Sequence, residues 1–196
     1  MPLSWLSICD WDSRGLCRFR RDRSSALGDS GAGKSTLGYA CARAGWTYVT
    51  DDASFLVLGR EDSLVVGNAR QARFRSSAEE LFPELEGRPT LQRAGTGKPS
   101  VELCTSQCAY LKTSFSTPAR YVVFLNRHSD EGGKLLPLAA DVARAYIFQR
   151  GVGIPEAVAS QVDAVERLLA RGVFELHYSN LDWAIDRLAR LAQDGR

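Results

Sequence analysis

The sequence contains no long hydrophobic run. No segment offers the ~18 consecutive apolar residues of a membrane-spanning helix. The first 15 residues, MPLSWLSICDWDSRG, also lack the charged start and the long apolar core of a signal peptide. These two absences argue against a membrane protein. They predict a cytoplasmic location and no membrane partner.

An excess of charge of either sign is also missing. Lysine and arginine number 25 against 23 aspartates and glutamates, which gives a formal net charge of +2. The basic run at 18–23 is short, and the rest of the sequence contains no longer basic run with interleaved aromatic residues. This balance argues against nucleic acid as a partner, because so small a net charge attracts a polyanion only weakly.

Cysteine and histidine are too sparse and too scattered for a zinc site. Five cysteines are an odd number, and the only close pair is Cys104 and Cys108. The two histidines, His128 and His177, lie far from each other in the sequence. A structural zinc site needs a second ligand pair at short spacing. Free thiols are therefore expected, in a chain whose 44% apolar residues are enough for one globular domain.

One short segment carries a chemical signature. Residues 28–36 read GDSGAGKST and fit the phosphate-binding pattern G-x-x-x-x-G-K-[ST]. In this pattern the glycines let the backbone wrap a phosphate, Lys34 reaches the outer phosphates, and Ser35 can ligate Mg²⁺. The expected ligands are ATP and Mg²⁺. The residues predicted to bind them are Gly28, Asp29, Ser30, Gly31, Ala32, Gly33, Lys34, Ser35 and Thr36.

The sequence around this loop predicts a helix after it. Residues 35–44 favour a helix that ends with Gly45 in the C′ position. Its N-terminus would direct backbone N–H groups at the phosphates. Residues 21–27, RDRSSAL, do not resemble the apolar strand that normally precedes such a loop.

The rest of the chain predicts alternating strands and helices. Apolar periodicity and turn residues give strands at 46–50, 121–126, 135–138 (at a sheet edge) and 174–178, a hairpin of 55–58 with 64–66, and a loop over 87–100. Helices are expected at 77–81, opened by a Ser77/Glu80 capping box, at 141–149, from Pro155 to Gly172, and at 181–191, capped by Ser179 or Asn180. The fold class is therefore α/β, a single P-loop domain with a mixed sheet.

Two adjacent carboxylates follow the strand expected after the P-loop helix. Asp51 and Asp52 lie 17 and 18 residues after Lys34. On an extended strand end their side chains point to opposite sides, so one can face Mg²⁺ while the other acts as a general base. The alternative is that Asp51 and Asp52 only cap a turn, as acidic residues at strand ends often do.

The segments GDSGAGKST and GWTYVTDD together resemble the catalytic domain of HPr kinase/phosphorylase, a bacterial serine kinase family related in fold to phosphoenolpyruvate carboxykinase. The similarity continues through GNARQARFR at 67–75, ELFPEL at 80–85, GKPSVEL at 97–103 and VFLNR at 123–127. It covers the chain from residue 28 onward. The resemblance implies a P-loop kinase domain at 28–196 after an atypical N-terminal segment at 1–27.

The resemblance also implies roles for individual residues. Lys34, Asp51, Asp52 and Arg73 would be catalytic, with Asp51 and Ser35 holding the metal. The family uses an arginine after its aspartate pair. Arg73 matches it best.

Other basic residues are weaker candidates. Arg70 and Arg75 are close alternatives to Arg73 for the family's arginine. Lys98 and Arg127 could face the same site, but a solvated surface position is the preferred reading for both.

The chain departs from the family before the loop. HPr kinases carry an N-terminal domain and an upstream histidine, whereas only 27 residues and no histidine precede Gly28 here. This departure is compatible with a truncated N-terminus and argues against HPr itself as the substrate.

The resemblance predicts an ATP-dependent kinase acting on a serine of a protein, peptide or small molecule. It is also compatible with a homo-oligomer. The alternatives are a nucleotide-binding regulator without turnover and a P-loop NTPase.

Overall fold

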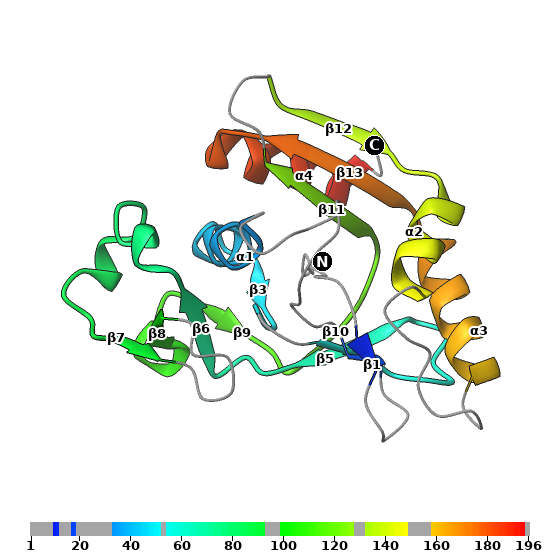
Figure 1. Ribbon diagram of the computed structural model, residues 1–196, viewed down its shortest axis with the longest axis horizontal. Helices are drawn as coiled ribbons and strands as arrows, with labels where there is room; N and C mark the ends of the chain where they lie inside the picture. The colour runs from blue at the N-terminus through cyan, green and yellow to red at the C-terminus, as the bar shows by residue number, and fades with distance from the viewer. Residues whose placement is uncertain are drawn as a thin grey trace.

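The computed structural model describes residues 10–11, 17–18, 33–51, 54–92, 99–127, 132–148 and 158–194. Within these ranges the fold is α/β, as expected, and at least one sheet is mixed. The strands are divided among four small sheets, however, and do not form the one mixed sheet that the sequence predicted. Figure 1 shows helix α1 (Lys34–Arg43) near the centre of the molecule, between two of these sheets.

Helix α1 confirms the helix expected after the P-loop. It ends as predicted, because Gly45 has φ of 94° and its N–H donates to the carbonyl of Ala42 at 3.0 Å. The N–H of Trp46 donates to the carbonyl of Cys41 at 3.1 Å. These two hydrogen bonds form a Schellman motif, in which a glycine in the left-handed region satisfies the last carbonyls of the helix.

A three-stranded sheet lies on one side of α1. Strand β11 (Val122–Arg127) runs parallel to β13 (Val173–Tyr178), and β12 (Lys134–Pro137) pairs antiparallel with β13 at the edge. This arrangement confirms the strand expected at 121–126 and the edge position expected for 135–138. One face of the sheet packs against α1 and α4 (Leu181–Asp194) through a core that includes Leu37, Leu125, Leu176 and Leu188. The carboxyl ends of β11 and β13 therefore lie beside α1.

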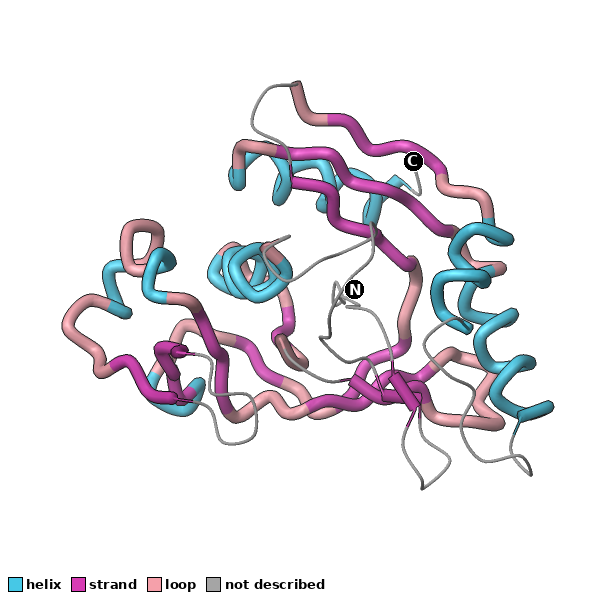
Figure 2. Tube along the Cα trace, in the orientation of Figure 1, coloured by secondary structure: helices cyan, strands magenta, loops and turns pink. Residues whose placement is uncertain are grey.

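Helices α2 (Ala140–Phe148) and α3 (Val158–Leu169) pack together in a second core with β11. Figure 2 shows these two helices side by side, away from α1. Their positions confirm the predicted helices, although Pro155 lies outside the described residues. On α3, Val162 is 37% exposed, whereas its polar neighbour Gln161 is fully buried together with Leu168. Helix α4 begins as predicted, since Oδ1 of Asn180 accepts a hydrogen bond from the N–H of Trp183 at 2.8 Å.

A second three-stranded sheet covers the opposite side of α1. Strands β6 (Gln71–Phe74), β8 (Pro99–Cys104) and β7 (Thr90–Gln92) are antiparallel, in the order β6-β8-β7. The loop expected over 87–100 is therefore wrong at 90–92 and at 99–100, and residues 93–98 lie outside the described residues. Strand β7 is exposed along its whole length, so no alternation of apolar residues marks it in the sequence. Phe74, Val101 and Leu103 pack with Tyr39 of α1 in a third core.

The helix predicted at 77–81 is replaced by a single 3₁₀ turn, η1 (Ser76–Ala78). Arg75 occupies the N-cap position and no side chain caps the turn, so the predicted Ser77/Glu80 capping box does not form. Two further 3₁₀ turns are η2 (Pro83–Leu85) and η3 (Thr105–Gln107). A helix of one turn buries almost no apolar surface. The capping signal in the sequence was therefore not enough to predict the length of the helix.

The remaining strands form two sheets. The predicted hairpin is confirmed by β4 (Ser54–Leu56) pairing with β5 (Leu64–Gly67), and β10 (Ser116–Pro118) extends that sheet. The atypical N-terminal segment contributes β1 (Asp10–Trp11) and β2 (Cys17–Arg18) to the same sheet. The strand predicted at 46–50 is shorter than expected, because only β3 (Thr47–Tyr48) pairs, in parallel with β9 (Lys112–Thr113).

None of the helices in the described ranges is both long enough and apolar enough to cross a membrane.

Candidate functional site

Gly33 occupies the N-cap position of α1 in a conformation that favours glycine. Its φ is +83°, and its carbonyl accepts the first helical hydrogen bond from the N–H of Leu37 at 2.8 Å. A Cβ at this position would lie 2.4 Å from the hydroxyl oxygen of Tyr178 and 3.8 Å from Cδ of Arg127. Gly33, the sixth residue of the GDSGAGKST motif, is therefore held tightly against the carboxyl ends of β11 and β13.

The hydroxyl of Ser35, at the same helix end, is buried without a hydrogen-bond partner among the described residues. The residue is 5% exposed, and its hydroxyl Oγ has no hydrogen-bond partner within the described residues. A buried hydroxyl without a partner costs about 1–3 kcal/mol, so such groups in folded proteins normally meet a ligand, ion or water. The Ser35 hydroxyl lies where the sequence predicts a ligand for Mg²⁺.

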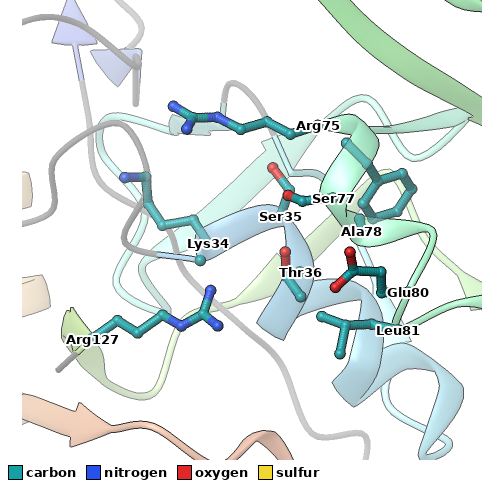
Figure 3. Close-up of a pocket in the computed structure, with 11 residues that line it drawn as sticks. Lys34, Ser35, Thr36, Arg75, Ser77, Ala78, Glu80, Leu81 and Arg127 are labelled. Atoms are coloured by element: carbon teal, nitrogen blue, oxygen red, sulfur yellow. The ribbon is translucent and has the colours of Figure 1, made fainter. Parts of the chain in front are cut away.

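A pocket of about 250 Å³ opens beside this helix end. Figure 3 shows the side chains that surround it, which come from α1, from the segment that follows β6, and from the end of β11. The lining residues are Gly33, Lys34, Ser35, Thr36, Phe74, Arg75, Ser77, Ala78, Glu80, Leu81 and Arg127. We call this cavity the α1 pocket. Four of the nine predicted nucleotide-binding residues lie in it.

The α1 pocket is rich in positive charge. Lys34, Arg75 and Arg127 all line it, and Glu80 is the one carboxylate among its described lining residues. The guanidinium of Arg127 and the carboxylate of Glu80 extend toward Thr36 from opposite sides of α1 (Figure 3). Positive side chains at a helix N-terminus add to the partial positive charge of the helix itself. The arrangement suits a polyphosphate.

Arg127 also acts on Tyr178, whose hydroxyl lies close to Gly33. Burial raises the pKa of Tyr178 to about 12, while the positive charge of Arg127 opposes that rise. The phenol therefore stays protonated at neutral pH, and it adds no negative charge beside the pocket.

Asp51 lies in a different environment from the one predicted. It is 8% exposed and is not among the residues that line the α1 pocket. Its Oδ1 accepts a hydrogen bond from the Tyr48 hydroxyl at 3.1 Å, and its Oδ2 accepts one from the backbone N–H of Arg73 at 2.9 Å. In the described part of the chain, Asp51 thus joins the end of β3 to β6. Asp52 lies outside the described residues.

The arginine preferred from the sequence is also directed elsewhere. Nε of Arg73 donates to Oε1 of Glu102 at 2.8 Å, across the β6–β8 pair, and Arg73 does not line the α1 pocket. Arg75, its close alternative, does. Arg70 lies over the ring of Phe115, with its guanidinium carbon 5.6 Å from the ring centroid.

Two charged residues of the pocket were not expected there. A solvated surface position was preferred for Arg127, and Glu80 was expected in a capping box. Both follow elements that a sequence pattern can find, the end of a buried strand and a short turn, but only the tertiary fold brings them to α1. Gly28, Asp29, Ser30, Gly31, Ala32 and Lys98 lie outside the described residues.

A second cavity of about 410 Å³ adjoins the α1 pocket. The two share Thr36, Glu80, Leu81 and Arg127. The second cavity is otherwise lined by residues at the end of β13 and the start of α4, namely Tyr178, Ser179, Asn180, Leu181 and Asp182. We call it the α4 pocket. The two cavities share a wall at the carboxyl ends of β11 and β13, where ligands of α/β proteins commonly bind.

No known protein family, curated protein or solved structure matches this chain. The candidate site must therefore be interpreted from its own residues. Within the ranges that the structure describes, no three histidine, cysteine, aspartate or glutamate side chains are grouped as metal ligands.

Proposed function

We propose that this chain is an ATP-dependent phosphotransferase of the HPr kinase-like type, which transfers the γ-phosphate of ATP to the hydroxyl of a serine or a similar alcohol. The observation that carries the proposal is the Ser35 hydroxyl, which is buried beside the α1 pocket without a partner in the described chain. A P-loop serine in this position is suited to ligating Mg²⁺. The GDSGAGKST motif supplies the other half of the argument.

The residues present fit a magnesium–nucleotide complex. Lys34, Arg75 and Arg127 line the α1 pocket and would hold phosphate oxygens, and Ser35 would hold the metal. Phosphoryl transfer depends mainly on this kind of positioning and charge neutralisation. ATP supplies the phosphoryl group when it is bound.

Substituting Ser35 tests this assignment without relying on turnover. Ser35→Ala removes a buried hydroxyl that has no partner in the described chain, so we expect the free energy of unfolding to stay the same or to rise. Binding of ATP in the presence of Mg²⁺, measured by calorimetry, should weaken, whereas binding without Mg²⁺ should change little. A loss of stability with unchanged Mg²⁺-dependent binding would show that the hydroxyl is structural.

Turnover is tested with ATP labelled at the γ-phosphate. Lys34→Ala should abolish label transfer to serine while the circular dichroism spectrum is retained, and Lys112→Ala, an exposed lysine on β9, should leave transfer unchanged. Transfer that persists in Lys34→Ala would refute the kinase proposal. Free phosphate as the only product would identify an NTPase instead.

A second candidate function is a nucleotide-binding regulator without turnover. Its support is Asp51, the carboxylate predicted to act on metal and acceptor, which instead accepts hydrogen bonds from Tyr48 and from the backbone of Arg73. A carboxylate held in this way contributes to the fold. If the protein binds ATP tightly, and the bound ATP is recovered intact after prolonged incubation with an extract of the cells that produce the protein, the regulator is the better description.

A further inference from the structure

The α4 pocket differs in charge from the α1 pocket. Among the described residues, Lys34, Arg75 and Arg127 line the α1 pocket with one carboxylate, that of Glu80. The described lining of the α4 pocket has two carboxylates, Glu80 and Asp182, and one cation, Arg127. Charges placed a few ångströms apart in a partly desolvated cavity interact strongly, so each pocket favours ligand groups of the opposite sign. The first suits a polyphosphate and the second suits a cation.

The two carboxylates of the α4 pocket are available for such a cation. Glu80 and Asp182 are exposed, and neither forms an ion pair or hydrogen bond within the described chain. The neighbouring Asn180 is already committed, because its Oδ1 caps α4. Tyr178 is 3% exposed, so its ring offers the pocket no face on which a nucleobase could stack. The lining therefore favours a small cationic ligand over a nucleoside.

We infer that the α4 pocket binds the phosphate acceptor, and that this acceptor is an amino alcohol, a molecule with a hydroxyl close to a protonated amine. The inference rests on the proposed function, since the α1 pocket must hold the donor. Asp182 lines only the α4 pocket and pairs with the ammonium group. Glu80 and Arg127 line both pockets and stand at the border between acceptor and donor.

The chemical step balances with ATP as the only co-substrate. A new bond forms between the acceptor oxygen and the γ-phosphorus, and the bond from that phosphorus to the β,γ-bridging oxygen breaks. The hydroxyl proton passes to the carboxylate of Glu80, which borders both pockets. The products are ADP and a phosphomonoester that keeps its amine. Arg127 neutralises charge at the same border.

Three acceptors of almost equal size test the charge preference. Ethanolamine carries the ammonium group, ethylene glycol replaces it with a neutral hydroxyl, and glycolate replaces it with a carboxylate. Phosphorus NMR measures phosphomonoester formation from ATP with each of them. We expect kcat/KM for ethanolamine to exceed that for ethylene glycol about tenfold or more, since one charge-assisted hydrogen bond is worth that factor. Glycolate should be the poorest acceptor.

Two matched variants assign the preference to the pocket. Asp182→Asn should raise KM for ethanolamine and bring the ethanolamine to ethylene glycol ratio close to 1. Asp186→Asn alters an exposed carboxylate one turn further along α4, paired with Arg190 at 3.4 Å, and should leave the ratio unchanged. Ethanolamine binding observed by saturation-transfer NMR should be lost in Asp182→Asn and kept in Asp186→Asn, independently of turnover.

The outcomes separate this inference from the proposed function. An unchanged acceptor ratio in Asp182→Asn, or a preference for ethylene glycol or glycolate, would overturn the acceptor assignment and leave the kinase intact. Calorimetry with ATP and with inorganic triphosphate gives a further control. If Asp182→Asn weakens ATP binding but not triphosphate binding, the pocket holds the nucleoside and the inference is wrong. If the unaltered protein binds neither, the proposed function itself fails.

Discussion

Replacing Gly33 by alanine should destabilise the protein through two separable effects. The first is the backbone, because φ of +83° lies in the left-handed region, where a side chain costs about 1–2 kcal/mol. The second is the contact of the new Cβ with the hydroxyl of Tyr178, at 2.4 Å. Tyr178 is 3% exposed, so its ring cannot swing aside freely. Overpacking of this kind costs about 1–3 kcal/mol.

The two effects can be separated by a double-mutant cycle. In Tyr178→Phe the hydroxyl oxygen is gone, and the next atom that the Cβ would meet is Cζ at 3.6 Å, an ordinary contact distance. We therefore expect Gly33→Ala to lower the free energy of unfolding by about 2–5 kcal/mol alone and by about 1–2 kcal/mol in the Tyr178→Phe background.

The assay is urea denaturation of the four proteins of the cycle, followed by circular dichroism. The difference between the two Gly33→Ala effects is the coupling energy of the Cβ with the tyrosine hydroxyl. A coupling below about 0.5 kcal/mol would refute the close approach of the loop to β13, because neighbouring residues in real contact exceed that value. Unchanged stability in the single variant would refute both effects.

Three further predictions concern the framework of the site. Asp51→Ala should cost about 1–3 kcal/mol in urea denaturation, since the partly buried N–H of Arg73 loses its acceptor and the Tyr48 hydroxyl is left with the carbonyl of Gln71, whereas Asp62→Ala at an exposed ion pair should change stability little. Burial tends to raise the pKa of Glu84, but a backbone N–H, two tyrosine hydroxyls and a nearby arginine lower it overall. Stability should therefore be present above pH 4.5 and lost as the pH falls through the lower folded pKa, a dependence that Glu84→Gln should reduce in acid titrations. Asn180→Ala should cost about 1 kcal/mol by loss of the helix cap, and Ser179→Ala, with no hydrogen bond in the described chain, should cost almost nothing in the same thermal melts.

The elements with strong local signals were predicted well. Helix α1 was identified from its glycine stop, and α4 from its Asn180 cap and apolar stripe, because both signals act within a few residues of the helix end. Strand β11 was found because it is buried along most of its length. Strand β7 was missed for the opposite reason, since all of its residues are exposed. Burial, more than propensity, decided which strands could be seen in the sequence.

The division of the strands into several sheets was not predictable in the same way. Strand β6 pairs with β8, about 30 residues further along the chain, and only this long-range pairing separates it from the hairpin of β4 and β5. No local pattern specifies which of several short strands will pair. The expectation of a single sheet was based only on the number of strands. Which strands pair with one another is decided by the tertiary fold.

The same holds for single residues of the candidate site, because local sequence patterns do not specify their long-range contacts. The motif alone was enough to predict that Lys34 and Ser35 lie together at one helix N-terminus, where both line the α1 pocket. It was not enough to choose between Arg73 and Arg75, since Arg73 lies in β6 and Arg75 follows it directly. Their contacts differ, because Arg73 pairs with Glu102 of β8 and Arg75 lines the α1 pocket.

Arg127 shows most directly why the sequence did not identify every residue of the candidate site. It is the last residue of β11, and β11 runs parallel to β13 beside α1, so its side chain reaches both pockets. A sequence alone shows an arginine after a buried strand, which is usually a solvated position. Because α1 lies between two sheets, residues from both sheets meet at its N-terminus. A phosphate motif in the sequence therefore indicates the proposed donor site, while the residues of the proposed acceptor site, Glu80, Arg127 and Asp182, are brought together only by the fold.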